Sequence, residues 1–304
     1  MKAAHKKELA AVFIAVAVFA AFFLYGTWQN DRQSQREEQV KDKRLALIAQ
    51  KLDSLNILAK AVAVYDASTN EELYSRNATV PLPLASLTKI MTVLVALNDY
   101  GRDGEITISR AAVNREGNYG LLVGEKWRVE DLAKLTLVVS SNDGAYALAD
   151  DQLKEFLNKM NDKARAIGLS SAVFLDPTGL DIDNKATGEP VGAGSYASAR
   201  DMNVLALFAL RDYPDIFSAT VLPDITVKSL SGFTHTVKNT DEDIGKIPNL
   251  LFSKTGNTDM AGGNLTIIFK NALGHEIAIT VLGSTYEGRF TDMEKIVNAL
   301  YGMN

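Results

Sequence analysis

The longest uninterrupted apolar pattern of the chain lies near its N-terminus. Three lysines occur within residues 1–8, no charged residue occurs from Leu9 to Tyr25, and the uncharged character continues to Trp28. At ~1.5 Å per residue, a helix over residues 9–28 would cover roughly the 30 Å hydrocarbon core of a membrane. Lysines before such a run and aromatic residues at its end are typical of a span whose N-terminus stays in the cytoplasm.

Two interpretations of this run remain open. A cleaved signal peptide has a shorter apolar region and ends in small residues, whereas this run ends in the bulky FFLYGTWQN. We therefore expect residues 1–8 to be a basic cytoplasmic tail and residues 9–28 a transmembrane signal anchor. This makes the protein single-pass in the cytoplasmic (inner) membrane, with its body on the periplasmic or extracellular side. The alternative is that this segment is a signal peptide that is cleaved off. In either case the body is exported.

Residues 29–58 change from highly charged to amphipathic. Leu45, Ile48, Leu52 and Leu55 follow helical spacing. The pattern predicts a helical stalk or linker between the membrane and the body. A short coiled coil is the sharper alternative, although one or two heptads are weak support for it.

The body, residues 59–304, begins and ends with strand patterns and has helical patterns in its middle. Alternating segments predict a hairpin over 61–77 and further strands over 104–109, 225–230, 234–239, 250–256, 264–270 and 276–284. Helical patterns cover 86–101, 129–139, 143–168, 199–214 and 290–302. Glycine should cap the first helix at Gly101 and the third at Gly168. We expect an α+β fold: an antiparallel sheet, assembled from both ends of the chain, with an α-helical cluster packed on it.

Composition excludes several classes of protein. The 304 residues are 47% hydrophobic and 23% charged, as in ordinary globular chains, and they include no cysteine and three histidines. Disulfide scaffolds, thiolate zinc sites and cysteine nucleophiles are therefore excluded, and no metal or cofactor is expected. The net charge of −5 leaves the region after residue 58 acidic, so no nucleic-acid partner is expected either.

The histidines are also poor candidates for a catalytic triad. His235 lies in a strand pattern and His275 in a turn pattern, and neither has a nucleophile motif beside it. Serine chemistry based on lysine remains possible. Ser86 and Lys89 are three residues apart, so on a helix they share a face, and a partly desolvated lysine can act as a base. Alone, Ser-x-x-Lys is expected about once by chance in a chain of this length.

Two further short motifs occur later in the chain. Ser140-Ser141-Asn142 falls between two helical patterns, where a loop could present Ser140 and Asn142 to a cleft. Lys254-Thr255-Gly256 ends a strand pattern, and Gly256 allows a ligand to approach the backbone closely. Each motif by itself has a purely structural explanation, such as a helix cap. The ordered set, with gaps of 54 and 114 residues, is far more specific.

This set resembles the three motifs of penicillin-recognising serine enzymes. The flanking sequences PLASLTKIMTVLVAL, FLDPTGL and SKTGNTDMAGGNL resemble those of the D-alanyl-D-alanine carboxypeptidases among the low-molecular-mass penicillin-binding proteins. The resemblance covers residues 59–302 and implies a β-lactamase/transpeptidase-like fold. Ser141, Phe252-Ser253 and Asn257 depart from the residues common in that family, and these departures concern substrate preference more than mechanism.

The resemblance implies a role for each residue. Ser86 would form the acyl-enzyme, Lys89 would be its base, Ser140 would relay a proton to the leaving amine, and Asn142 would orient Lys89 or the substrate. Lys254, Thr255 and Gly256 would bind the terminal carboxylate, with Arg289 near it. The amides of Ser86 and Asn257 would form the oxyanion hole. For Arg289, a solvated surface arginine is the competing interpretation.

The implied partners are peptidoglycan stem peptides ending in D-Ala-D-Ala, β-lactam antibiotics, and the membrane through the N-terminal helix. The implied activity is that of a serine-type carboxypeptidase, with no cofactor. A D,D-endopeptidase that cuts cross-links shares every motif. A β-lactamase-like enzyme is disfavoured because no Glu-x-x-Leu-Asn lies between Asn142 and Lys254. A non-catalytic penicillin-binding protein would not need Ser86 and Lys89 together.

Overall fold

The computed structural model describes residues 2–117, 119–184 and 186–301; for residues 2–18, 20, 21 and 151 it describes the backbone alone. The chain divides into two compact units, Met1–Gln50 and Lys51–Asn304.

The first unit consists of helix α1 (Lys2–Asp53), which extends three residues into the second unit. Most side chains of the apolar run predicted to span a membrane, at residues 9–18, 20 and 21, lie outside the described residues. Within the residues that are described, no helix is both long enough and apolar enough to cross a membrane. The stalk predicted over 29–58 is helical as far as Asp53.

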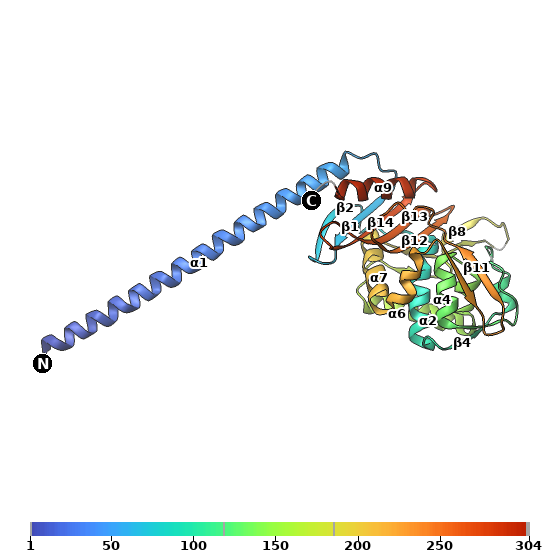
Figure 1. The fold of residues 1–304 in the computed structure, drawn as a ribbon, viewed down its shortest axis with the longest axis horizontal. Coiled ribbons are helices and arrows are strands. Elements are labelled where there is room, and N and C mark those ends of the chain that lie inside the picture. The colour runs from blue at the N-terminus through green and yellow to red at the C-terminus, as the bar shows by residue number, and fades with distance from the viewer. Residues whose placement is uncertain (1, 118, 185, 302–304) are drawn as a thin grey trace. The chain divides into compact units, whose positions relative to one another are not determined.

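The second unit is built around a five-stranded antiparallel sheet in the order β12-β13-β14-β1-β2 (Figure 1). Its strands are β1 (Ala61–Asp66), β2 (Glu71–Arg76), β12 (Leu250–Thr258), β13 (Gly262–Lys270) and β14 (Glu276–Ser284). The predicted strands from the two ends of the body meet where β1 pairs with β14, with Val64 opposite Ile279. The prediction of one antiparallel sheet formed from both ends of the chain is confirmed.

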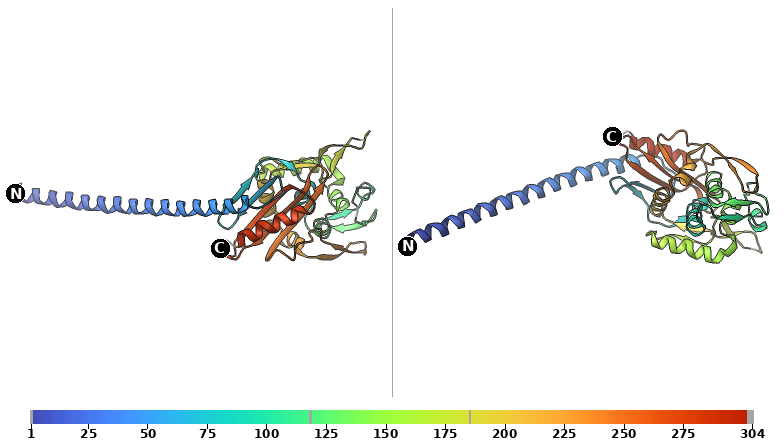
Figure 2. Two further views of the ribbon diagram at one scale, coloured as in Figure 1. Left: turned by 90° about the horizontal axis from the view of Figure 1, so that it is seen from above. Right: turned by 60° about the horizontal axis from the view of Figure 1, so that its bottom comes forward.

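Helices cover both faces of this sheet (Figures 1 and 2). Helix α9 (Gly288–Tyr301) packs on β13 and β14, and α7 (Ala199–Asp212) packs on β14 and β1 from the other side. A capping box at Ser198 and Asp201 begins α7, and Pro214 lies just beyond its end and opens the short helix α8 (Pro214–Phe217). The α+β class predicted from the sequence is therefore the fold of this unit.

The helical cluster beside the sheet contains the first two motifs. It includes η1 (Ala85–Thr88), α2 (Lys89–Tyr100), α4 (Val129–Val138), α5 (Asn142–Ala147) and α6 (Leu153–Ala166). Gly101 and Gly168 lie just beyond the ends of α2 and α6 with φ of 69° and 80°, as predicted. The helix predicted over 86–101 begins as a short 3₁₀ helix, η1, and becomes α-helical only at Lys89. Ser86 therefore lies in η1 and not in an α-helix.

The single helix predicted over 143–168 is wrong, because the structure divides it into α5, a 3₁₀ turn at η2 (Asp150–Gln152) and α6. Every residue of α5 is buried, whereas α6 buries one stripe formed by Phe156, Met160 and Ala164. A straight helix could not enter the core on all sides and then lie on its surface, so the axis changes between them.

Short elements complete the unit. They are β3 (Leu82–Pro83), β4 (Glu105–Thr107), α3 (Arg110–Val113), β5 (Lys126–Arg128), β6 (Val173–Phe174), β7 (Asp181–Asp183), β8 (Pro190–Ala193), β9 (Ser195–Ala197), η3 (Ser218–Val221), β10 (Asp224–Lys228) and β11 (Thr234–Lys238). Strands β6 to β9, β3 and β5 lacked a sequence pattern because strands of two to four residues are too short for an alternation to show.

Candidate active site

Two lysines are among the largest fully buried side chains of the protein. Lys89 is 0% exposed and Lys254 is 1% exposed. Lysine is almost never fully buried in proteins, because removing an ammonium group from water is costly unless it has partners. Both lysines come from the predicted motifs, and each contacts a half-buried serine, Ser86 or Ser140. The two pairs therefore define the candidate active site.

The Lys89 amine has three oxygen partners. Its Nζ lies 2.8 Å from Ser86 Oγ, 2.6 Å from Asn142 Oδ1 and 2.7 Å from the carbonyl oxygen of Thr178. The orientation of the Asn142 amide is set from its other end, because its Nδ2 donates to the Glu116 carbonyl at 2.8 Å. Ser86, Asn142 and Thr178 come from three separate parts of the chain, and all three contact the Lys89 amine.

Close backbone packing positions Ser86. Ala85 has a positive φ of 49°, which is uncommon for a residue with a side chain and turns the chain sharply into η1. Gly179 approaches this turn from one side: a Cβ there would lie 2.0 Å from the Ala85 carbonyl oxygen. Gly256 approaches from another side, where a Cβ would lie 2.8 Å from the Leu84 carbonyl oxygen. Only glycine fits at these two positions.

Burial lowers the pKa of Lys89 to about 7, and the negative charges of Asp176 and Asp143 partly oppose this effect. An amine with such a pKa is neutral in a large fraction of molecules near neutral pH. A neutral amine beside a serine hydroxyl can accept its proton. The geometry and the pKa together suit Lys89 to the role of general base.

The second pair faces the same site from the sheet. Lys254 Nζ donates to Ser140 Oγ at 2.9 Å and to the Thr255 carbonyl oxygen at 2.9 Å. Ser140 has a φ of 61°, so it is held in the left-handed region between α4 and α5. Such strain persists only where the surrounding structure maintains it, and it is concentrated at functional sites. The predicted loop presents Ser140, whereas Asn142 is already the first residue of α5.

Two basic side chains, Lys254 and Arg289, are buried near one another on this side of the site. Burial lowers the pKa of Lys254 well below its usual value, and the neighbouring charges of Lys89 and Arg289 lower it further. Arg289 is 2% exposed, so the competing interpretation of a solvated surface arginine is wrong. Its guanidinium donates to the Gly256 carbonyl at 3.2 Å and stacks on Tyr286 and Phe290, while its Nε has no hydrogen-bond partner. An anionic ligand would compensate these buried cations.

Strand β12 lies at the edge of the sheet, so one side of its backbone is not paired with another strand of that sheet. The amide of Ser253 donates to Thr220 Oγ1 at 3.1 Å, away from β13. Because hydrogen-bonding directions alternate along a strand, the amides of Thr255 and Asn257 point to the same open side. Asn257 is an exposed residue, and the open side of β12 that its amide faces suits the predicted oxyanion hole.

The hydroxyl of Thr255, which the resemblance assigns to carboxylate binding, has a partner within the protein. Its hydroxyl lies 2.6 Å from the hydroxyl of Thr240, a residue that no sequence motif indicated. Other partners were also missed: the carbonyls of Thr178 and Glu116 that hold Lys89 and Asn142. Backbone carbonyls carry no sequence signature, although the Asp-Pro-Thr-Gly turn around Thr178 could have indicated a tight loop.

A groove of ≈ 690 Å³ adjoins this cluster. Its walls include Glu116 and Asp176, which belong to the loops that contact Asn142 and Lys89, and Asn257, which comes directly after the third motif. It is lined by Asn114, Arg115, Glu116, Asp176, Leu180, Asp181, Ile182, Asp183, Gly188, Pro190, Asn257, Thr258 and Asp259. There is accordingly space beside Asn257 for an extended ligand.

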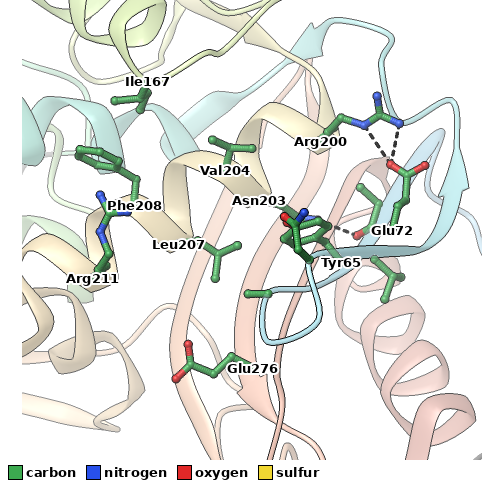
Figure 3. A pocket seen from close by; sticks show the side chains of 14 residues that line it. Tyr65, Glu72, Ile167, Arg200, Asn203, Val204, Leu207, Phe208, Arg211 and Glu276 are labelled. Carbon is green, nitrogen blue, oxygen red and sulfur yellow. Dashed lines mark hydrogen bonds and ion pairs between the residues drawn. The ribbon is translucent and has the colours of Figure 1, made fainter. Parts of the chain in front are cut away.

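A larger hollow, ≈ 840 Å³, lies between α7 and the β1–β2 hairpin (Figure 3). Figure 3 shows Arg200 paired with Glu72, and Leu207 and Phe208 also line the hollow. The ion pair between Arg200 and Glu72 measures 2.6 Å. None of the described residues that line it is a predicted site residue or a serine. Its size alone does not make it the reactive centre.

The two histidines of the body each pair with a carboxylate. His235 Nε2 lies 2.8 Å from Glu125 Oε1, and His275 Nδ1 lies 2.8 Å from Asp66 Oδ2. Neither of these contacts involves a residue of the serine and lysine cluster. Within the described residues, no group of acidic and histidine side chains could hold a metal ion.

Comparison with known proteins matches this chain to a family. The family model described as D-alanyl-D-alanine carboxypeptidase matches residues 48–285. A D-alanyl-D-alanine carboxypeptidase of Bacillus subtilis is 29% identical over 79% of this chain and 61% of its own length. A D-alanyl-D-alanine endopeptidase of Pseudomonas aeruginosa is 33% identical over 66% of this chain and 63% of its own length. The chain thus spans about three fifths of these curated relatives.

Solved structures agree with the fold. The penicillin-binding protein D2 of Listeria monocytogenes, solved in an ampicillin-bound form, is 29% identical with a TM-score of 0.66; the match covers 81% of this chain and 98% of that one. The sheet with its helical cluster is therefore the fold of a penicillin-binding protein. From the family match over most of the body and the meeting of its three motifs around Ser86, the chain belongs to the D-alanyl-D-alanine carboxypeptidase family of serine peptidases.

Proposed function

We propose that this protein is a serine-type D-alanyl-D-alanine carboxypeptidase, which removes the terminal D-alanine from peptidoglycan stem peptides through an acyl-enzyme on Ser86. The observation that carries this proposal is the set of three contacts around the buried Lys89 amine. These contacts place a base of suitable pKa beside a half-buried serine hydroxyl. The family match supports the choice of substrate.

Acylation is a direct consequence of this arrangement. Neutral Lys89 takes the proton of the Ser86 hydroxyl as Oγ attacks the carbonyl carbon between the two D-alanines. The amides of Ser86 and Asn257 receive the oxyanion, a contribution of about 3 kcal/mol for each donor in comparable sites. The carbon–nitrogen bond then breaks, and the acyl group stays on Ser86 as an ester.

The leaving amine needs a proton. The Ser140 hydroxyl can donate its own proton and recover one from Lys254, whose Nζ lies 2.9 Å away. The strained backbone of Ser140 keeps its hydroxyl in this position. Lys89 then gives up the proton that it took from Ser86, and Lys254 regains one from solvent. Water attacks the ester, its hydroxyl goes to the acyl carbon and a proton returns to Ser86 Oγ, which releases the shortened peptide.

The terminal carboxylate of the substrate is the anion that suits the cationic side of the site. Lys254 and Arg289 are buried, and the positive charge of Arg289 disfavours that of Lys254. A bound carboxylate would compensate both charges. Because the Thr255 hydroxyl already has Thr240 as a partner, Thr255 would contribute by exchanging that bond or by its backbone amide.

D,D-endopeptidase activity on cross-links is the second candidate. The 33% identical relative is named an endopeptidase, and the groove beside Asn257 opens to solvent-exposed residues such as Glu116 and Asp259. Both reactions cleave a bond after a D-alanine carbonyl, and they differ in the group on the amine side of that bond. In the carboxypeptidase reaction that group is the terminal D-alanine, and in the endopeptidase reaction it is part of a neighbouring stem peptide.

Digestion of purified muropeptides separates these activities. The full chain is incubated with uncross-linked pentapeptides and with cross-linked dimers, and the products are identified by mass spectrometry. We expect loss of one alanine from the pentapeptides, and no loss in the Ser86→Ala variant. Conversion of dimers to monomers without loss of alanine from pentapeptides would identify an endopeptidase, and no product from either substrate would reject both.

β-Lactams are the proposed inhibitors, since the similar Listeria protein was solved with ampicillin bound. A β-lactam carries a carboxylate close to its reactive carbonyl, as the substrate does. Labelled penicillin should therefore attach covalently to the wild type and not to Ser86→Ala. Labelling of that variant at another serine would refute the assignment of the nucleophile.

We also propose that residues 9–28 anchor the protein in the cytoplasmic membrane, with the body on the periplasmic or extracellular side. The support comes from the sequence: an uncharged run from Leu9 to Trp28 preceded by lysines. Protease added to spheroplasts should digest the body, whereas full protection would contradict the proposal. A soluble mature protein that begins beyond Trp28 would show that the segment is cleaved.

A further inference from the structure

The turn from Asp176 to Leu180 attaches to α2 through two successive carbonyl groups. The Pro177 carbonyl accepts from Thr92 Oγ1 at 2.6 Å, and the Thr178 carbonyl accepts from Lys89 Nζ at 2.7 Å. Lys89 and Thr92 are three residues apart, so they share a face of α2. Side chains of α2 thus bind the backbone of this turn, and the position of the Thr178 carbonyl matters directly to the Lys89 amine.

The carboxylate of Asp176 shapes this turn. Its Oδ1 accepts from the Thr178 amide at 2.7 Å and from the Gly179 amide at 3.2 Å, and it also bonds to the Thr178 hydroxyl. Its Oδ2 lies 3.8 Å from the Arg115 guanidinium, which itself stacks on Tyr146 at 3.8 Å. One aspartate therefore ties the turn together and connects it to the groove wall.

The Thr178 carbonyl limits how the Lys89 amine can be oriented. A neutral amine has two N–H groups and one lone pair. The Thr178 carbonyl can only accept, and so can Asn142 Oδ1, because the other end of that amide is committed to the Glu116 carbonyl. Both N–H groups are therefore used, and the lone pair is left for Ser86, the one partner that can donate.

We propose that Asp176 is a positioning residue for acylation: it holds the Thr178 carbonyl against the Lys89 amine, so that the lone pair of the amine faces the Ser86 hydroxyl. Asp176 need not touch the substrate's reacting atoms. The inference rests on the proposed acylation of Ser86, and it adds a residue outside the three motifs to the machinery of that step.

Asp176 also acts through its charge. The charged groups that face Lys89 are Asp176 and Asp143, which raise its pKa, and Lys254, which repels it. Arg115 faces Asp176 from the groove side. Removing the negative charge of Asp176 lowers the pKa of Lys89, so more of the amine stays neutral in acid. The acidic limb of the acylation profile should then move to lower pH.

The decisive variant is Asp176→Asn, because asparagine keeps an acceptor oxygen for the two turn amides and removes the charge. The rate of labelling by penicillin is measured from pH 5 to pH 9 for the full chain. We expect the acidic limb to move down by about one pH unit, with the rate at high pH within about threefold of the wild type. Asp176→Ala, which loses the acceptor as well, should show the same movement and a high-pH rate reduced about 10- to 100-fold.

The matched control is Asp162→Asn, which removes one negative charge from an exposed ion pair with Arg165 on α6. The acidic limb of its labelling profile should coincide with that of the wild type. Thermal unfolding of each variant checks that it folds. If Asp176→Asn folds and its limb does not move, the charge role is overturned. If Asp176→Ala folds and keeps the wild-type rate at high pH, the positioning role is overturned. Absence of labelling in the wild type would instead reject the proposed function.

Discussion

The helical side and the sheet side of the site each hold a fully buried lysine, but the charges around the two lysines differ. On the helical wall, Lys89 has three oxygen partners and two carboxylates nearby, and its pKa is about 7. On the sheet wall, Lys254 donates to the oxygens of Ser140 and Thr255, and the positive charges of Lys89 and Arg289 lower its pKa. The first environment suits a base that cycles between charged and neutral forms, and the second suits a receptor for an anion.

The difference shows that burial alone does not assign a role to a lysine. Desolvation is the largest cause of the lowered pKa in both residues. They differ in their strongest neighbouring charges. The carboxylates of Asp176 and Asp143 lie beside Lys89, whereas Lys254 lies near the cations Lys89 and Arg289, whose effect on its pKa is partly opposed by Asp241. A carboxylate bound near Lys254 would make its surroundings resemble those of Lys89.

The largest effect is expected from Lys89→Met, which keeps the length and packing of the side chain and removes the base. Acylation by labelled penicillin should fall by about 10³-fold or more, since general-base catalysis contributes 10²- to 10⁴-fold. Thermal unfolding should show a folded but less stable protein, because methionine fills the space of the lysine while the Asn142 and Thr178 oxygens lose its amine as a donor. Labelling within tenfold of the wild type would place the base elsewhere.

Lys254→Ala should have the next largest effect. Charge-assisted contacts are worth ~1.5–3 kcal/mol, so its loss should reduce acylation efficiency roughly 10- to 150-fold. Lys254→Arg should lose less acylation efficiency because it keeps the charge, although the guanidinium group is larger than the amine that it replaces. The informative comparison uses substrates with a free and an amidated terminal carboxylate. The wild type should prefer the acid strongly, and Lys254→Ala should prefer it much less; equal preference in both would remove Lys254 from carboxylate recognition.

A substitution of Arg289 tests whether this residue, as well as Lys254, binds the substrate carboxylate. Its guanidinium is already engaged with the Gly256 carbonyl and two aromatic rings, so less of it remains for a ligand than of Lys254. We expect Arg289→Gln to lose roughly tenfold in hydrolysis of the acid substrate, or about 1.4 kcal/mol. Hydrolysis of the amidated substrate should change little. An equal loss on both substrates would indicate a structural role for Arg289.

The smallest effect is the pH dependence of the wild type. With a Lys89 pKa of about 7, the neutral fraction is about 9% at pH 6, 50% at pH 7 and 91% at pH 8. Because the neutral amine is the base, penicillin labelling should rise roughly fivefold from pH 6 to pH 7 and less than twofold from pH 7 to pH 8. Stopped-flow or quench measurements of the labelling rate check this. A rate that falls as pH rises over this range would mean that the charged form is the active one.

Local sequence patterns were enough to predict the strands at both ends of the body, most of the helices and the three motifs. The patterns are alternation in 250–256, the helical repeat and Gly101 cap of 86–101, and short motifs in a fixed order. Ser86 and Lys89 are three residues apart in consecutive helical segments, so their contact could be predicted from spacing alone. The anchor at residues 9–28 stays a prediction.

The remaining features of the site depend on long-range packing. The Thr178 and Glu116 carbonyls and the Thr240 hydroxyl reach the site through contacts between segments that are separated in the chain. Backbone groups are the same in every residue, so no sequence pattern announces them. The pKa of Lys89, the burial of Arg289 and the division of 143–168 into two helices are likewise consequences of packing. Local pattern specifies which side chains are available, and long-range packing sets the charge and the solvent around them.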